Sequence, residues 1–78
     1  MHLVIAKVDQ VFYDGEAYSL KAPGVDGEMT ILGEHMPLIT TLKPGTLEVR
    51  EQAGADPKIF PVSSGVLEVC HDGVTVIL

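Results

Sequence analysis

Residues 65–78 read GVLEVCHDGVTVIL, and this stretch decides the fold class. Apolar side chains recur at every second position on both sides of its centre, at Leu67, Val69, Val74, Val76 and Leu78. A period of two places each apolar set on one face of a β-strand. Asp72-Gly73 separates the two runs and is a strong hairpin signal. The stretch therefore predicts two antiparallel strands with one buried face.

The same period appears in earlier parts of the chain. Apolar residues alternate with polar ones in two further segments, at Tyr18, Leu20 and Ala22 and at Leu47 and Val49. The opening run, residues 3–8, is apolar on both faces, which is typical of a strand that is buried on both sides. Pro61 has no N–H group, so its strand is expected to be an edge or to carry a bulge.

Residue pairs typical of turns occur about every ten residues along the chain. This is the spacing of short strands in a sandwich or barrel. Two Pro-Gly pairs, Pro23-Gly24 and Pro44-Gly45, suit type II turns. Gly or Pro interrupts almost every window long enough for a stable helix, and at most one short turn fits at residues 35–38. We therefore predict one domain over residues 1–78, an all-β, small antiparallel β-sandwich of short strands.

Composition excludes several classes of partner. The 78 residues carry a net charge of −6, and an acidic surface is repelled by phosphate backbones and anionic headgroups. Nucleic-acid binding and direct lipid insertion are therefore not expected. Cys70 is the only cysteine, which rules out an intrachain disulfide.

No pattern of catalytic, cofactor-binding or metal-binding residues stands out. His2, His35 and His71 are not paired with Cys or another His at metal-ligand spacing, and no phosphate-binding loop occurs. The cluster 70–72, Cys-His-Asp, lies where a strand would send neighbouring side chains to opposite faces. From the residues alone, the chain is an acidic all-β module for protein contacts, and we expect no catalytic residue, cofactor or metal.

Two longer stretches carry a family resemblance. The first is GEMTILGEHMPL at residues 27–38, continued by LKPG at residues 42–45. The second is SGVLEV at residues 64–69, with VTV at residues 74–76. In their order and spacing these stretches resemble the amino-terminal β-sandwich domain of the epsilon subunit of the rotary (F-type) proton-translocating ATP synthase.

The resemblance implies a non-catalytic subunit of the central stalk, or rotor, that couples the proton-driven membrane ring to gamma and the catalytic head during ATP synthesis. It implies that Glu28 contacts the ring (c) subunits and that His35 and Thr40 contact gamma. It also implies a peripheral membrane protein on the cytoplasmic face of the bacterial inner membrane, attached through the complex. The helical hairpin that follows this domain in the family is expected to be absent from residues 1–78.

Each of these residues also has an ordinary structural interpretation. His35 fits a loop histidine, Glu28 a solvated carboxylate at the start of a strand, and Thr40 a residue with high strand propensity. The alternative function is a free-standing β-sandwich module that binds a protein or a glycan. Such a module needs an exposed aromatic groove, and the adjacent Phe12 and Tyr13 are expected to face opposite ways, which leaves one of them as the candidate exposed ring.

Overall fold

The computed structural model describes residues 1–33 and 37–78, and the regular elements in these two ranges are all strands. They are β1 His2–Lys7, β2 Gln10–Glu16, β3 Ser19–Gly24, β4 Gly27–Leu32, β5 Leu38–Leu42, β6 Gly45–Arg50, β7 Lys58–Val62, β8 Gly65–Cys70 and β9 Gly73–Ile77. The predicted all-β class is confirmed. The described residues contain no helix with the length and apolar character to cross a membrane.

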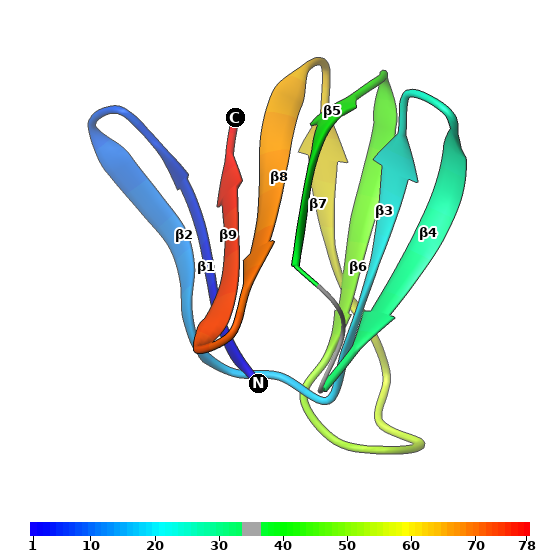
Figure 1. Ribbon diagram of the computed structural model, residues 1–78. Coiled ribbons are helices and arrows are strands. Elements are labelled where there is room, and N and C mark those ends of the chain that lie inside the picture. The colour runs from blue at the N-terminus through cyan, green and yellow to red at the C-terminus, as the bar shows by residue number, and fades with distance from the viewer. Residues whose placement is uncertain (34–36) are drawn as a thin grey trace.

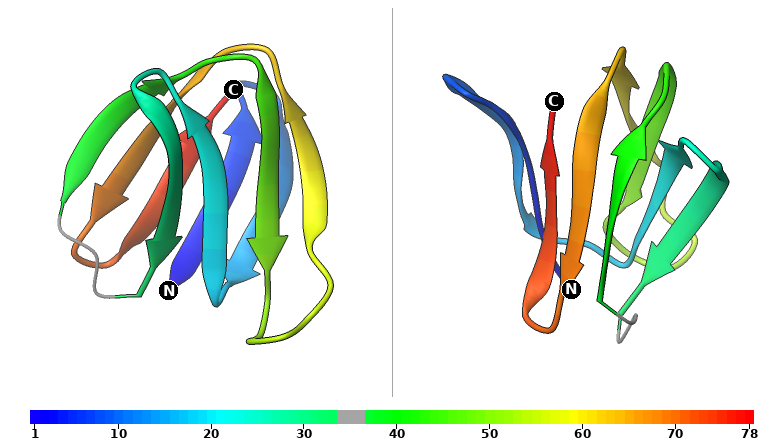
Figure 2. Two further views of the ribbon diagram at one scale, coloured as in Figure 1. Left: turned by 90° about the vertical axis from the view of Figure 1, so that its right-hand side faces the viewer. Right: turned by 45° about the horizontal axis from the view of Figure 1, so that its top comes forward.

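The strands form one strongly curled sheet that folds into two facing layers (Figures 1 and 2). One layer has the order β2-β1-β9-β8-β5, and the other has the order β4-β3-β6-β7. Every pairing is antiparallel except that of β1 with β9, in which Leu3 lies opposite Val74. The described strands therefore form a sandwich with a single parallel pair, made by β1 and β9.

The core fills the space between the two layers, and it is aliphatic. Its fully buried large side chains alternate along their strands, as the period of two predicts: Leu3, Ile5, Leu20, Ile31, Leu47, Val49, Leu67 and Val76. The predicted hairpin at residues 65–78 is confirmed, with Cys70 opposite Gly73 and a loop of two residues between them. Burial of these aliphatic side chains is the main favourable term for a domain of this size.

Two apolar residues do not lie where their pattern placed them. Tyr18 precedes β3 rather than belonging to it, and half of its surface is exposed. Val8 lies beyond the end of β1 in the turn to β2 and is fully exposed. The expectation for residues 3–8 is therefore wrong at its last two residues, because the strand ends at Lys7 and Lys7 itself is exposed.

β3 joins the two layers by changing its partner. Its first half pairs with β6, from Ser19 to Lys21, and its last residue, Gly24, pairs with Leu42 of β5. Pro23 lies at this change, where its missing N–H removes no β6 pairing and its carbonyl accepts a hydrogen bond from the Lys43 N–H at 2.9 Å. A proline in a buried strand is thereby accommodated.

This arrangement contradicts the prediction of type II turns at the two Pro-Gly pairs. A type II turn needs a positive φ at the glycine, and the glycines with positive φ are Gly27 and Gly54. Pro23 and Gly24 are buried strand residues, and the chain turns one step later, at residues 25–26. Gly45 is already the first residue of β6.

The outer strands β2 and β7 are linked through aromatic side chains. Pro61 lies on β7, which ends the sheet order, so the predicted edge position is confirmed. The ring of Phe60 on β7 meets the ring of Tyr13 on β2 edge-on, with 6.3 Å between the ring centroids. The ring of Phe12 is also half-buried, because a β-bulge makes Ile5 pair with Tyr13 and Ala6 with Val11, leaving Phe12 as the extra residue. The expectation that Phe12 and Tyr13 face opposite ways is therefore wrong: both pack against the core.

Gly65 provides a test of the packing at the start of β8. A Cβ atom added there would lie 2.6 Å from the carbonyl oxygen of Ile77, which is a backbone atom. We expect Gly65→Ala to lower the free energy of unfolding by about 1–3 kcal/mol, the usual range for overpacking. Urea denaturation followed by far-ultraviolet circular dichroism measures this change.

Gly15 is the matched control, because nothing lies within 4 Å of a Cβ atom added at that position of β2. Gly15→Ala should leave the stability unchanged or raise it slightly, since glycine within a strand is unfavourable. Equal urea midpoints for the two variants would show that β8 and β9 are not packed as closely as described.

Candidate functional site

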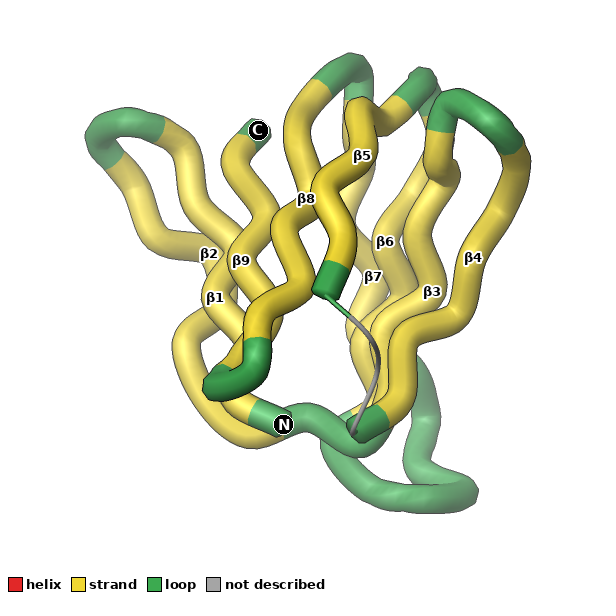
Figure 3. Tube along the Cα trace, viewed as in Figure 1, coloured by secondary structure: helices red, strands yellow, loops and turns green. Residues whose placement is uncertain are grey.

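The connections between strands gather at the two ends of the sandwich (Figure 3). We call one of them the hairpin end; it carries the connections 8–9, 25–26, 43–44 and 63–64. The opposite end carries the connections 17–18, 51–57 and 71–72. β4 runs from the hairpin end to the opposite end, so residues near its start and after its finish belong to different ends.

Glu28 lies at the hairpin end, as the second residue of β4, and its side chain is 63% exposed. One carboxylate oxygen lies 3.4 Å from Nζ of Lys21 on β3, and Lys21 lies 3.9 Å from a carboxylate oxygen of Glu48 on β6. Two carboxylates thus share one ammonium group across three neighbouring strands. Because exposed ion pairs are worth only about 0–1 kcal/mol, Lys21 leaves Glu28 available to a partner.

The other two predicted contact residues do not join Glu28. His35 lies outside the described residues, which resume at Pro37 after Gly33. Thr40 is in the middle of β5, in register with the buried Leu67, so it is on the core side of the strand and is half-buried. Its hydroxyl donates to the Thr41 carbonyl at 3.3 Å. The structure therefore separates Glu28 from Thr40 rather than assembling them into one site.

The layer that contains β5 has an exposed apolar surface that the sequence analysis did not identify. Its members lie on the side away from the core, and we call them the outer face: Val11, Ile39, Val66 and Ile77. Three of them belong to one row across the strands, since Ala6 pairs with both Val11 and Ile77, and Ile77 pairs with Val66. The signal was available in the sequence, because Val66 and Ile77 fall out of phase with the buried positions of their strands.

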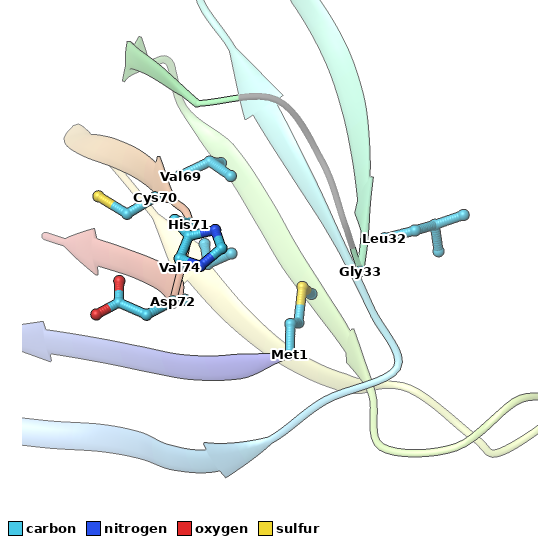
Figure 4. A pocket seen from close by; sticks show the side chains of 9 residues that line it. Met1, Leu32, Gly33, Val69, Cys70, His71, Asp72 and Val74 are labelled. Carbon is cyan, nitrogen blue, oxygen red and sulfur yellow. The ribbon is translucent and has the colours of Figure 1, made fainter.

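A cavity of about 270 Å³ lies at the opposite end, next to the β8–β9 turn (Figure 4). Met1, Val69, His71 and Val74 line it, together with Leu32 and Gly33 at the end of β4. Figure 4 shows the side chains of Cys70 and Asp72 pointing away from the His71 ring. Among residues 1–33 and 37–78, no three His, Cys, Asp or Glu side chains are grouped so that they could hold a metal ion.

The four aromatic rings do not gather into one exposed groove, although Phe12 and Phe60 line a hollow of about 210 Å³ with Pro61 and Leu78. Phe12, Tyr13 and Phe60 are half-buried against the core, and Tyr18 alone is exposed. Tyr13 is also held by polar contacts, since its hydroxyl donates to the Glu16 carbonyl at 2.6 Å. Burial and the neighbouring Glu51 carboxylate raise the pKa of Tyr13. These contacts make Tyr13 part of the framework.

Cys70 is exposed on the last position of β8, and its neighbours suppress its ionisation. Desolvation by nearby atoms, followed by the negative charges of Glu68 and Asp72, raises the pKa of the thiol. A raised pKa leaves less of the reactive thiolate at neutral pH. Exposure alone therefore does not make this cysteine reactive.

We expect Cys70 to react with a disulfide reagent at pH 8 more slowly than a small model thiol. The rate should rise as the pH increases, and Glu68→Gln should raise it at fixed pH because one of the repelling charges is removed. The rate of release of the coloured leaving thiol measures both effects. Urea-unfolded chain is the control, since unfolding exposes the thiol to water and removes its desolvation, while Glu68 and Asp72 stay two residues away in the sequence. A folded protein that reacts faster than this control would contradict the assignment.

Comparison with known proteins gives a consistent family. The family model described as "ATP synthase, Delta/Epsilon chain, beta-sandwich domain" matches residues 1–78. The ATP synthase epsilon chain of Laribacter hongkongensis is 40% identical over 77 residues, which cover 99% of this chain and 55% of that relative. The ATP synthase epsilon chain of Alkalilimnicola ehrlichii is 38% identical over 77 residues, covering 99% of this chain and 54% of the relative. The chain thus spans about half the length of the curated relatives it matches.

Two solved structures share the fold. A chain in the mitochondrial ATP synthase of Euglena gracilis, in a structure of its OSCP, F1 and c-ring parts, superposes with a TM-score of 0.89 at 24% identity, covering 99% of this chain and 49% of that one. A chain in the central stalk and c-ring of the Tetrahymena thermophila mitochondrial ATP synthase superposes with a TM-score of 0.82 at 13% identity, covering 99% and 61%. At these identities the likeness shows the fold alone.

Proposed function

Because the chain belongs to the delta/epsilon-chain β-sandwich family of ATP synthases, we propose that it works as a non-catalytic part of the central stalk. In this role it joins the proton-driven membrane ring to gamma, so that ring, gamma and sandwich turn together and torque reaches the catalytic head. The match of the family model to the whole chain is the observation that carries this proposal. It makes the protein a peripheral component of the membrane, attached through the complex on the cytoplasmic face.

The shape of the domain supports a coupling role. The two layers pack around one aliphatic core, and the folded domain measures 27 × 23 × 23 Å. Candidate contact residues lie on different parts of this body, with Glu28 at the hairpin end and the outer face along one layer. A rigid body with two separate contact surfaces can transmit a turning force between two partners.

We assign Glu28 to the ring. In the family that this chain resembles, ring subunits present an arginine on their polar loops, and a carboxylate can accept two charge-assisted hydrogen bonds from a guanidinium. Glu28 is mostly exposed, and its ion pair with Lys21 is easily exchanged for a pair with a partner. Two-point hydrogen bonding fixes the orientation of the partners as well as their affinity.

We assign the β5 region to gamma, with one change from the residue expected. The Thr40 side chain is on the core side of β5, so the side chains that this strand presents outward are Ile39 and Thr41. Ile39 is 71% exposed and belongs to the outer face, an apolar surface suited to a large protein contact. His35 is assigned to gamma on the resemblance alone, because it lies outside the described residues.

Charge reversal at Glu28 tests the ring assignment. Glu28→Ala removes a contact worth about 0.2–1 kcal/mol at an interface rim, so the complex should stay largely assembled. Glu28→Arg places like charges together and should weaken the binding of the stalk to the ring. In vesicles that contain the whole ATP synthase, we expect Glu28→Arg to lower proton-driven ATP synthesis while ATP hydrolysis by the detached head stays intact.

The control must lie far from Lys21, which excludes Glu48 because Glu48 approaches the same ammonium group. Asp56 is suitable, since it is exposed in the connection 51–57 at the opposite end of the sandwich. Asp56→Arg should leave ATP synthesis unchanged. If both reversals lower synthesis equally, or if Glu28→Arg couples normally, Glu28 does not contact the ring.

A further inference from the structure

We propose that Tyr13, Glu51, Lys58 and Phe60 form a side-chain latch that holds the two layers of the sandwich closed along the line where β2 faces β7. We call this line the seam. Release of the latch lets the layers part about the corner, the point at Pro23 where β3 changes its partner. The inference concerns the domain by itself and does not depend on the proposed function.

The two sides of the sandwich are closed by different kinds of contact. At the corner the layers are joined through the backbone, since Gly24 pairs with Leu42 of β5. Beside this pair, the Pro23 carbonyl accepts a hydrogen bond from the Lys43 N–H at 2.9 Å. At the seam, in the described parts of the chain, β2 pairs only with β1 and β7 only with β6. Among those residues the seam is therefore closed by side chains.

Tyr13 on β2 is the centre of the latch. Its ring centroid lies 6.3 Å from that of Phe60 and 5.7 Å from Nζ of Lys58. Glu51 approaches two of these partners, with one carboxylate oxygen 3.4 Å from the Tyr13 hydroxyl and the other 3.3 Å from Nζ of Lys58. Glu51 follows β6 and Lys58 begins β7, so both ends of the connection between these strands contact one ring of β2.

Towards the hairpin end the seam is not filled. Phe12, Phe60 and Pro61 line a hollow of about 210 Å³ there, together with Lys7 at the end of β1. Side chains that face a hollow lose the dispersion contacts that a filled interface would give them. The latch, in the other half of the seam, therefore makes the larger contribution to closing it.

The contacts of the latch are weak ones. The side chains of Lys58 and Glu51 are 55% and 51% exposed, and exposed ion pairs and cation–π contacts contribute little to stability. The edges at the seam also carry features that oppose pairing with another chain, namely the bulge at Phe12 on β2 and Pro61 on β7. The seam can therefore open locally, without global unfolding and without offering a template for aggregation.

Cysteine labelling measures where the sandwich opens. Val49 and Val76 are both fully buried, and each is replaced by cysteine in the full chain with Cys70→Ser. Val49 lies on β6 opposite Lys58, next to the latch, whereas Val76 lies on β9 in the middle of the other layer. We expect Val49→Cys to react with a thiol reagent faster than Val76→Cys, after each rate is divided by that of the urea-unfolded chain. The reagent is kept dilute, so that the rate follows the population of the open state.

Variants of the latch should act mainly on the first of these positions. Lys58→Met removes the ammonium group and keeps an unbranched side chain, so it should raise the labelling of Val49→Cys about threefold. Tyr13→Ala removes the ring and should raise it about tenfold, with a much smaller change at Val76→Cys. In the double variant the increase should fall short of the product of the two, because Lys58 acts through the Tyr13 ring.

Lys21→Met is the matched control, because the ion pairs of Lys21 lie within one layer and should not affect the labelling of either cysteine. Equal labelling of the two cysteines in the otherwise unchanged protein would show that opening is not local to the seam, and the inference would fall. An equal increase at both cysteines in Lys58→Met would mean a general loss of stability and would also overturn it. Labelling of Val49→Cys that neither latch variant changes would remove these residues from any role in closing the seam.

Discussion

The whole arrangement depends on the change of partner that β3 makes at Pro23. Up to Lys21 the strand pairs with β6, and at Gly24 it pairs with β5 of the other layer. A strand can change partners only where it stops donating to the first one, and a residue without an N–H is suited to that position. This corner holds the layers together as one curled sheet, and it leaves their inner faces to be filled by aliphatic side chains.

The same corner positions the surfaces used for contacts. Because β3 and β4 continue past it as a hairpin, Glu28 projects from the hairpin end beside the loop 25–26. Because β5 is held at the corner only through Leu42, most of its length is paired with β8 alone, and Ile39 extends the outer face. The hairpin end and the outer face are therefore held in place by pairings within the same curled sheet.

Local patterns predicted the strands and most of the core, since alternation is a property of each strand by itself. These patterns failed where the conformation or orientation of a residue depended on a partner strand. Pro23-Gly24 looks like a turn until β5 and β6 are both present. Phe12 and Tyr13 are expected to face opposite ways until the bulge between Ile5 and Ala6 is known. The contact of Lys21 with both Glu28 and Glu48 joins three strands and has no local signal. The family positions of Glu28 and Thr40 were visible in the sequence, but the inward orientation of Thr40 follows from its register with Leu67.

The parallel pairing of β1 with β9 has a consequence for folding during synthesis on the ribosome. Leu3 is made long before its partner Val74, since seven strands lie between β1 and β9 in the described chain. Contacts so distant in sequence slow folding, because the chain must lose loop entropy before they form. Until β9 emerges, the β1–β2 hairpin has an unpaired inner edge, and such an edge is a template for pairing with a neighbouring nascent chain. The growing chain therefore passes through a vulnerable interval that ends only when β9 is inserted between β1 and β8.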